Sequence, residues 1–101
     1  MILGLDISTS ITGYTLMDED NIVLNGAWDT RKYKDFFEKV IHVKAGLEQI
    51  YSQYGKQITA IYIEQSLQSF RSGFSSAKTL STLSRFNGIV SWLVFDQLQI
   101  K

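Results

Sequence analysis

Apolar residues in the first third of the chain follow patterns that are typical of β-strands. Residues 2–8 form a short, largely apolar run, which predicts a buried strand. Residues 11–17 alternate apolar and small polar side chains, and residues 22–28 follow a polar turn over residues 18–21. We therefore predict three consecutive strands that form a meander.

The spacing of apolar residues then changes to that of a helix. The apolar positions lie three or four residues apart, as on one face of an amphipathic helix of about six turns. These positions are Phe36, Val40, Val43, Leu47, Ile50 and Tyr54. Asp29 or Thr30 is predicted to cap the start of this helix, and Gly55 fits its C-terminal end.

The remainder of the chain predicts a strand, a loop and a second helix. Residues 58–64 are apolar on both faces, which is typical of a strand that follows a crossover helix and lies parallel inside a sheet. Residues 65–74 show no clear period and predict a loop. A helix is predicted over residues 76–98, and its segment 89–95 is apolar nearly all round, which predicts burial on more than one side.

In chain order, the predicted elements are three meander strands, a helix, a central strand and a helix. This order predicts an α/β fold with a mixed sheet. A length of 101 residues supports a single domain, residues 1–101. No apolar run approaches the roughly 20 residues of a membrane span, and the first residues lack the pattern of a signal peptide. We therefore expect a cytoplasmic protein.

Composition and charge exclude several classes of function. Hydrophobic residues make up 45% of the chain and charged residues 20%, which argues against a disordered chain. Ten basic residues balance ten acidic ones, which argues against a polybasic binder, although local basic patches remain possible. With no Cys and a single His, the chain has no thiolate nucleophile or Cys-ligated zinc, and only hard oxygen ligands remain for a metal.

Two acidic residues stand at the ends of predicted apolar strands. Asp6 lies between Leu5 and Ile7, and Glu64 ends the strand 58–64. Each has a simple structural interpretation: Asp6 caps the following turn, and Glu64 reaches solvent. If the two strands are parallel neighbours, however, both carboxylates lie at the edge of the sheet where α/β proteins build sites. Mg²⁺ or Mn²⁺ would resolve their repulsion and could support phosphoryl-transfer chemistry.

The residues around both carboxylates resemble a known family. The run from Ile2 to Tyr14, Ile-Leu-Gly-Leu-Asp-Ile-Ser-Thr-Ser-Ile-Thr-Gly-Tyr, resembles the opening of the RuvC-type Holliday junction resolvases. That family begins with an apolar strand, an Asp, a short turn and Thr-Gly-Tyr or Thr-Gly-Trp. Residues 62–65, Tyr-Ile-Glu-Gln, resemble its Ile-Glu-Gln at the end of the fourth strand, and residues 87–90 are a third, weaker match.

The resemblance implies an RNase H-like fold and a metal-dependent endonuclease that cleaves branched DNA such as Holliday junctions, usually as a homodimer. Asp6 and Glu64 match the first two of the family's four acidic ligands for Mg²⁺ or Mn²⁺. Ile7 and Ser8 stand where most members have Pro-Gly, which resembles the phage-type members. The other two ligands of the family lie on a C-terminal helix beyond a further strand, and neither that strand nor that helix has a counterpart here. We therefore expect the N-terminal portion of such a domain, or a degenerate or split member, with an incomplete site.

Five residues beyond Glu64 are predicted to contact DNA: Phe70, Arg71, Phe74, Lys78 and Arg85. Aromatic side chains stack on unpaired bases, and Arg and Lys at helical spacing follow phosphates. The alternative is that both Phe side chains close over the core while the cations are solvated. The apolar segment 89–95 predicts a homodimer through the helix 76–98, with Trp92 or Phe95 at the contact.

Two other classes of protein remain open at this point. Sugar kinases and actin-like ATPases also begin with an apolar strand, an Asp and a Ser/Thr turn that cradles phosphate, as residues 2–10 do loosely. Those proteins normally have Gly in that turn, and they need two lobes and several times this length. A non-catalytic module that uses the fold and the segment 89–95 for dimerisation is the other alternative.

Overall fold

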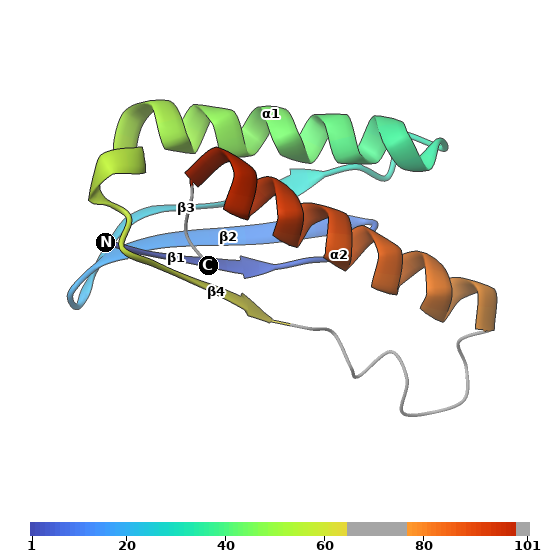
Figure 1. The fold of residues 1–101 in the computed structure, drawn as a ribbon, viewed down its shortest axis with the longest axis horizontal. Helices are drawn as coiled ribbons and strands as arrows, with labels where there is room; N and C mark the ends of the chain where they lie inside the picture. Colours follow the sequence, from blue (N-terminus) through green and yellow to red (C-terminus); the bar gives the residue numbers. More distant parts are fainter. Residues whose placement is uncertain (65–76, 99–101) are drawn as a thin grey trace.

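The computed structural model describes the backbone of residues 1–64 and 77–98 and the side chains of residues 1–64 and 81–97. It is a mixed α/β fold with a four-stranded mixed sheet and two helices (Figure 1). The elements are β1 (Ile2–Asp6), β2 (Ile11–Asp18), β3 (Asn21–Asp29), α1 (Phe36–Tyr54), the short 3₁₀ helix η1 (Gly55–Gln57), β4 (Ala60–Glu64) and α2 (Ala77–Leu98).

The strand order in the sheet is β3-β2-β1-β4. The first three strands form the predicted antiparallel meander, and β4 returns through the crossover helix α1 to pair with β1 in parallel. The parallel pairing is therefore confirmed. The expected central position of β4 is not found among the described residues, where β4 lies at the edge of the sheet. Tyr62, in the middle of β4, is accordingly 66% exposed.

Both helices lie on one face of the sheet and build the core with it (Figure 1). Side chains alternate along a strand, so Leu3 and Leu5 of β1 point to the same face and are buried there. The core residues are Leu3, Leu5, Ile7, Leu16, Val43, Leu47, Ile50, Ile58, Phe86, Val90, Leu93 and Val94. The predicted stripe of α1 is confirmed, because its other members Phe36, Val40 and Tyr54 pack against this core.

The opposite face of the sheet is not covered by α1 or α2. Exposed apolar side chains of this face include Ile2, Ile11 and Met17. Asp6 shares the face with Ile2, because both alternate with the buried Leu3 and Leu5. Ile2 and Met17 lie at one end of this face, and Asp6 lies toward the other end, where Ile11 is also exposed.

The start of α1 differs from the prediction. The helix begins at Phe36, and its N-cap is Asp35, whose side chain accepts a hydrogen bond of 3.2 Å from the backbone N–H of Glu38. Asp29 and Thr30 do not cap the helix, because residues 30–34 connect β3 to α1 before the helix begins. The side chain of Asp29 is bonded to Arg31, and that of Thr30 is bonded to the carbonyl groups of Thr9 and Ser10. Gly55 is the C-cap, as expected, but its backbone is right-handed and leads directly into η1.

The surface of α2 also differs from the prediction. Phe86, Val90 and Val94 face the core. The segment 89–95, however, is not buried on more than one side within the described chain, since Trp92 is 59% exposed and Phe95 is also exposed. Two core-facing positions per turn are enough to seat α2 on one sheet face, and the other side of the helix is left to solvent.

Candidate functional site

Asp6 and Glu64 are paired across two neighbouring parallel strands. Their Cα atoms are register partners, as are those of Leu5 and Ile63 one residue earlier. Adjacent strands lie about 4.8 Å apart, and paired residues of parallel strands point to the same face. The structure therefore brings together the two carboxylates that the sequence singled out, at the carboxyl ends of β1 and β4.

Both carboxylates lie on the uncovered face of the sheet and are exposed. On the other side of Asp6, its register partner in β2 is Gly13. A Cβ built on Gly13 would lie 3.9 Å from the Cβ of Asp6, so a glycine here keeps the β2 side of Asp6 free of a side chain. Neither α1 nor α2 covers the pair on this face of the sheet.

The turn that follows Asp6 is held by hydrogen bonds from three directions. Thr12 Oγ1 donates to the carbonyl of Ser8 at 2.9 Å, and the backbone N–H of Ser10 donates to Ser8 Oγ at 3.1 Å. Lys39, on the first turns of α1, donates from Nζ to the carbonyl of Thr9 at 2.6 Å. These contacts fix the chain directly after Asp6, which limits the freedom of the strand end that presents its carboxylate.

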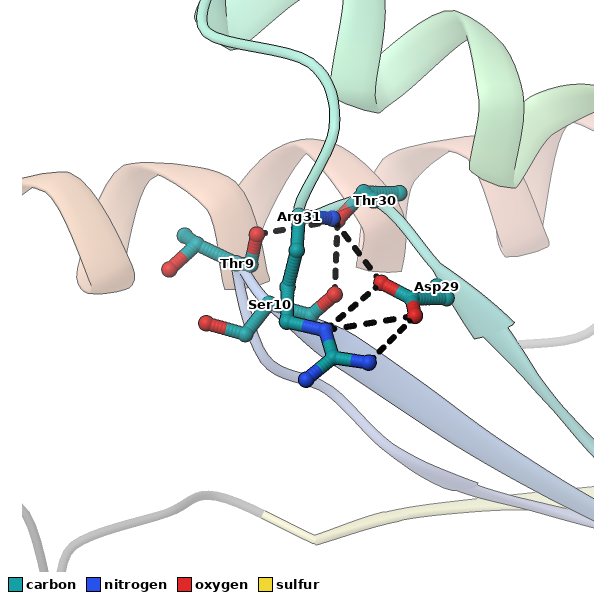
Figure 2. A network of polar contacts seen from close by, with 5 residues as sticks. All are labelled: Thr9, Ser10, Asp29, Thr30 and Arg31. Carbon is teal, nitrogen blue, oxygen red and sulfur yellow. Dashed lines mark hydrogen bonds and ion pairs between the residues drawn. The ribbon is translucent and has the colours of Figure 1, made fainter.

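Thr30 connects this turn to the end of β3 (Figure 2). Its side chain is fully buried, its backbone N–H donates to the carbonyl of Ser10 at 2.8 Å, and its hydroxyl lies 2.9 Å from the carbonyl of Thr9. A buried hydroxyl needs such partners, because an unsatisfied one would cost about 1–3 kcal/mol. The local sequence predicted a helix cap at Asp29 or Thr30, whereas the role of Thr30 depends on partners about twenty residues away.

Asp29 and Arg31 form a bidentate ion pair at the end of β3 (Figure 2). Arg31 donates from Nη2 and Nε to the two carboxylate oxygens at 2.7 and 3.0 Å, and its backbone N–H donates to Oδ1. The side-chain hydrogen bond from Arg31 is the main reason why the pKa of Asp29 falls to about 2. The same hydrogen bond raises the pKa of Arg31.

The residues predicted to contact DNA lie apart from this carboxylate pair or outside the described residues. Phe70, Arg71 and Phe74 lie outside the described residues, and so does the side chain of Lys78, which belongs to α2. Arg85 is exposed on α2, and its guanidinium carbon lies 5.6 Å from the ring centroid of Phe36. Arg85 is thus engaged in a cation–π contact with the start of α1.

An apolar groove between α1 and α2 was not predicted. It encloses about 570 Å³ and is lined by Phe36, Phe37, Thr82, Arg85, Gly88, Ile89 and Trp92. The exposed faces of Phe37 and Trp92 border it. The apolar residues of each helix were visible in the sequence, but their juxtaposition depends on how α2 packs against the N-terminal half of α1.

Asp6 and Glu64 fit a hard divalent cation in their donor chemistry and in their position. Carboxylate oxygens on adjacent strands are ligands that Mg²⁺ and Mn²⁺ accept, with water completing the shell. Among residues 1–64 and 81–97, no group of three or more His, Asp or Glu side chains comes together. Asp6 and Glu64 are therefore the two carboxylates that the described part of the chain places at this candidate site.

Comparison of the chain with protein-family models, with curated proteins and with solved structures gave no match. The fold and the carboxylate pair are therefore the observations that bear on the class of the protein. Within the described ranges, neither helix combines the length and apolarity that a membrane span requires.

Proposed function

We propose that the protein has an RNase H-like fold of the RuvC type and acts as a metal-dependent endonuclease on branched DNA such as Holliday junctions. The observation that carries the proposal is the register pairing of Asp6 with Glu64. These two residues are also the ones at which the sequence resembles the family's acidic ligands. The antiparallel meander, the crossover helix and the parallel fourth strand agree with that fold.

Asp6 and Glu64 would hold Mg²⁺ or Mn²⁺ on the uncovered face of the sheet. A bound ion of this kind activates water and stabilises the charge of a phosphoryl transition state. The chain's own contribution is to hold two carboxylates at adjacent strand ends, where their mutual repulsion favours a cation between them. Hydrogen bonds from Thr12, Thr30 and Lys39 hold the turn 8–10, and this turn limits the movement of Asp6.

Two carboxylates are only half of the acidic set that the resemblance implies. Two-metal hydrolysis needs ligands on both sides of the scissile phosphate. We therefore expect residues 1–101 to bind four-way junctions in a Mn²⁺-dependent way, but to cleave them very slowly or not at all. A non-catalytic module would bind a junction without any dependence on the two carboxylates.

The test is binding of a labelled four-way junction and of a linear duplex with the same arm sequence, with and without Mn²⁺. The expected result is tighter binding of the junction, with a Mn²⁺-dependent part that Asp6→Asn and Glu64→Gln both remove. Asp20→Asn is the matched control, because Asp20 is an exposed acid in the β2–β3 hairpin at the other end of the sheet. Equal binding of both DNAs, or a Mn²⁺ effect that persists in Asp6→Asn, would exclude the proposal.

A further inference from the structure

We infer that the segment between β3 and α1 is a phosphate-binding surface, in which Arg31, Lys32 and Lys34 contact the backbone of DNA that passes over Asp6 and Glu64. The inference rests on the proposed function for the identity of its ligand. This surface lies on other elements than the five residues that the sequence predicts to contact DNA, all of which follow Glu64.

Asp29, which directly precedes this segment, lies on the same face of the sheet as Asp6 and toward the same end. Asp6 pairs with Gly13, and Gly13 pairs with Ala27, so Ala27 lies on the same row two strands away. Asp29 follows two residues later on the same face, because the intervening Trp28 packs toward the core. Two strand spacings and two residues place the Cα of Asp29 about 12 Å from that of Asp6. One strand of B-DNA presents a phosphate about every 3.4 Å along its axis, so this distance spans three or four phosphates.

Arg31 is already held in place by Asp29. Its guanidinium is bound to Asp29 through Nε and Nη2, and its backbone N–H donates to the same carboxylate (Figure 2). These bonds occupy the side of the guanidinium that carries Nε and Nη2, so Nη1 points away from Asp29. Arg31 thus loses little conformational entropy when Nη1 meets a phosphate.

Positive charge exceeds negative charge by one in this segment. Residues 29–35 contain three cations, Arg31, Lys32 and Lys34, and two carboxylates, Asp29 and Asp35, although the chain as a whole is neutral. All three cations are exposed. A hollow of about 440 Å³ is lined by Asp29, Arg31 and Lys32. The Lys32 ammonium lies 5.1 Å from the ring centroid of Tyr33, which restricts its position at the rim. This excess of positive charge complements phosphates.

Hydrogen bonds of Thr30 hold the segment that carries the cations. Thr30, between Asp29 and Arg31, is buried and hydrogen-bonded to the turn that follows Asp6. The segment that carries the cations is therefore connected by hydrogen bonds to the turn that follows Asp6, at the ends of β3 and β1. A strand of DNA held at Arg31 would keep a defined offset from Asp6.

The experiment measures binding of the full 101-residue chain to a fluorescein-labelled four-way junction over a range of salt concentrations, in EDTA. Arg31→Gln, Lys32→Gln and Lys34→Gln are compared with Lys56→Gln. Lys56 is an exposed cation in η1, before β4, at the opposite end of the sheet. Each lost phosphate contact is expected to reduce the slope of log K against log salt by about 0.9 and to weaken binding several-fold at low salt. Lys56→Gln is expected to leave both unchanged.

This assay contains no metal and measures no cleavage, so its result is separate from the Mn²⁺ test of Asp6 and Glu64 that the proposed function depends on. If the wild type binds DNA and the three variants keep its affinity and slope, or if Lys56→Gln loses as much as they do, the phosphate surface is excluded while the nuclease proposal stands. If the three variants lose binding but Mn²⁺ binding is independent of Asp6, the surface stands and the nuclease proposal fails. A wild-type chain that binds no DNA in EDTA overturns the phosphate surface, and one that binds no junction with Mn²⁺ overturns the nuclease proposal.

Discussion

Asp6 of β1 and Glu64 of β4 are register partners in a parallel pair of strands, so both carboxylates rise from the same face of the sheet. The residues are 58 positions apart in the chain, and the crossover helix α1 closes the gap between their strands. The pairing places the Cα atoms of the two residues about 4.8 Å apart. A divalent cation bound between the two side chains would be attracted by both carboxylates.

The first prediction concerns this pair. Mn²⁺ alone should bind to the chain weakly, because two protein ligands leave most of the coordination shell to water. Asp6→Asn and Glu64→Gln should each reduce the affinity by at least tenfold, as measured by the loss of the free Mn²⁺ signal in electron paramagnetic resonance. Asp18→Asn, which removes an exposed acid at the far end of β2, should not change it. Wild-type affinity in Asp6→Asn would contradict the assignment.

The second prediction concerns assembly through α2. Trp92 and Phe37 are exposed at the groove between the helices, and a surface of this kind favours contact with a second copy of the chain. Sedimentation should show a concentration-dependent dimer, and Trp92→Asp should shift it to monomer. Tyr62→Asp is the matched control, because Tyr62 is similarly exposed but lies on β4. A wild-type monomer at high concentration would refute this prediction.

The third prediction compares two helical glycines. A Cβ on Gly46 of α1 would overlap with the indole Cε2 and Nε1 of Trp28, whereas a Cβ on Gly88 of α2 would meet no atom within 4 Å. Alanine favours a helix over glycine by about 1 kcal/mol. Gly88→Ala should therefore raise the free energy of unfolding by about 0.5–1 kcal/mol. Gly46→Ala should lower it, because overpacking costs about 1–3 kcal/mol.

Urea unfolding of both glycine variants at low protein concentration is the measurement. The indole of Trp28 also stacks on Tyr14, with ring centroids 4.6 Å apart, so it has little room to move aside. A stabilising Gly46→Ala would show that Trp28 can be displaced, and it would contradict the packing described here between β3 and α1.

The fourth prediction concerns the pH dependence of the Asp29–Arg31 pair. The pKa of Asp29 is lowered from 3.8 to about 2, mainly by its hydrogen bond from the Arg31 side chain. Because the folded pKa is depressed, the contribution to stability is present above the ordinary pKa and is lost as the pH falls through about 2. In NMR, the carboxyl carbon of Asp29 should titrate near 2, and in Arg31→Gln it should titrate closer to 3.8.

Salt provides a control for this titration. The pair is exposed, so added salt should screen it and move the midpoint of Asp29 upward in the wild type. The variant Arg31→Gln should show a much smaller salt effect. A midpoint near 3.8 in the wild type would mean that Arg31 does not hold the carboxylate in solution.

The sequence by itself determined the order of the elements and the two carboxylates worth attention. Strands and helices differ in local periodicity, and periods of 2 and about 3.6 residues can be read from neighbouring positions. The stripe from Phe36 to Tyr54 became the core face of α1 for this reason. Asp6 and Glu64 stood out because a carboxylate that ends an apolar strand is unusual wherever the strand lies.

Only the tertiary structure decided which distant groups meet. The register of β4 against β1, which pairs Asp6 with Glu64 and not with a neighbour, depends on how α1 closes the crossover. The carbonyl partners of Thr30 lie about twenty residues away, so the neighbours of Thr30 in the sequence do not reveal them and indicated a helix cap instead. The N-cap is Asp35, because the chain leaves the sheet before the helix begins. Local sequence carries information about conformation, whereas these contacts depend on chain closure and on the packing of two helices over one sheet.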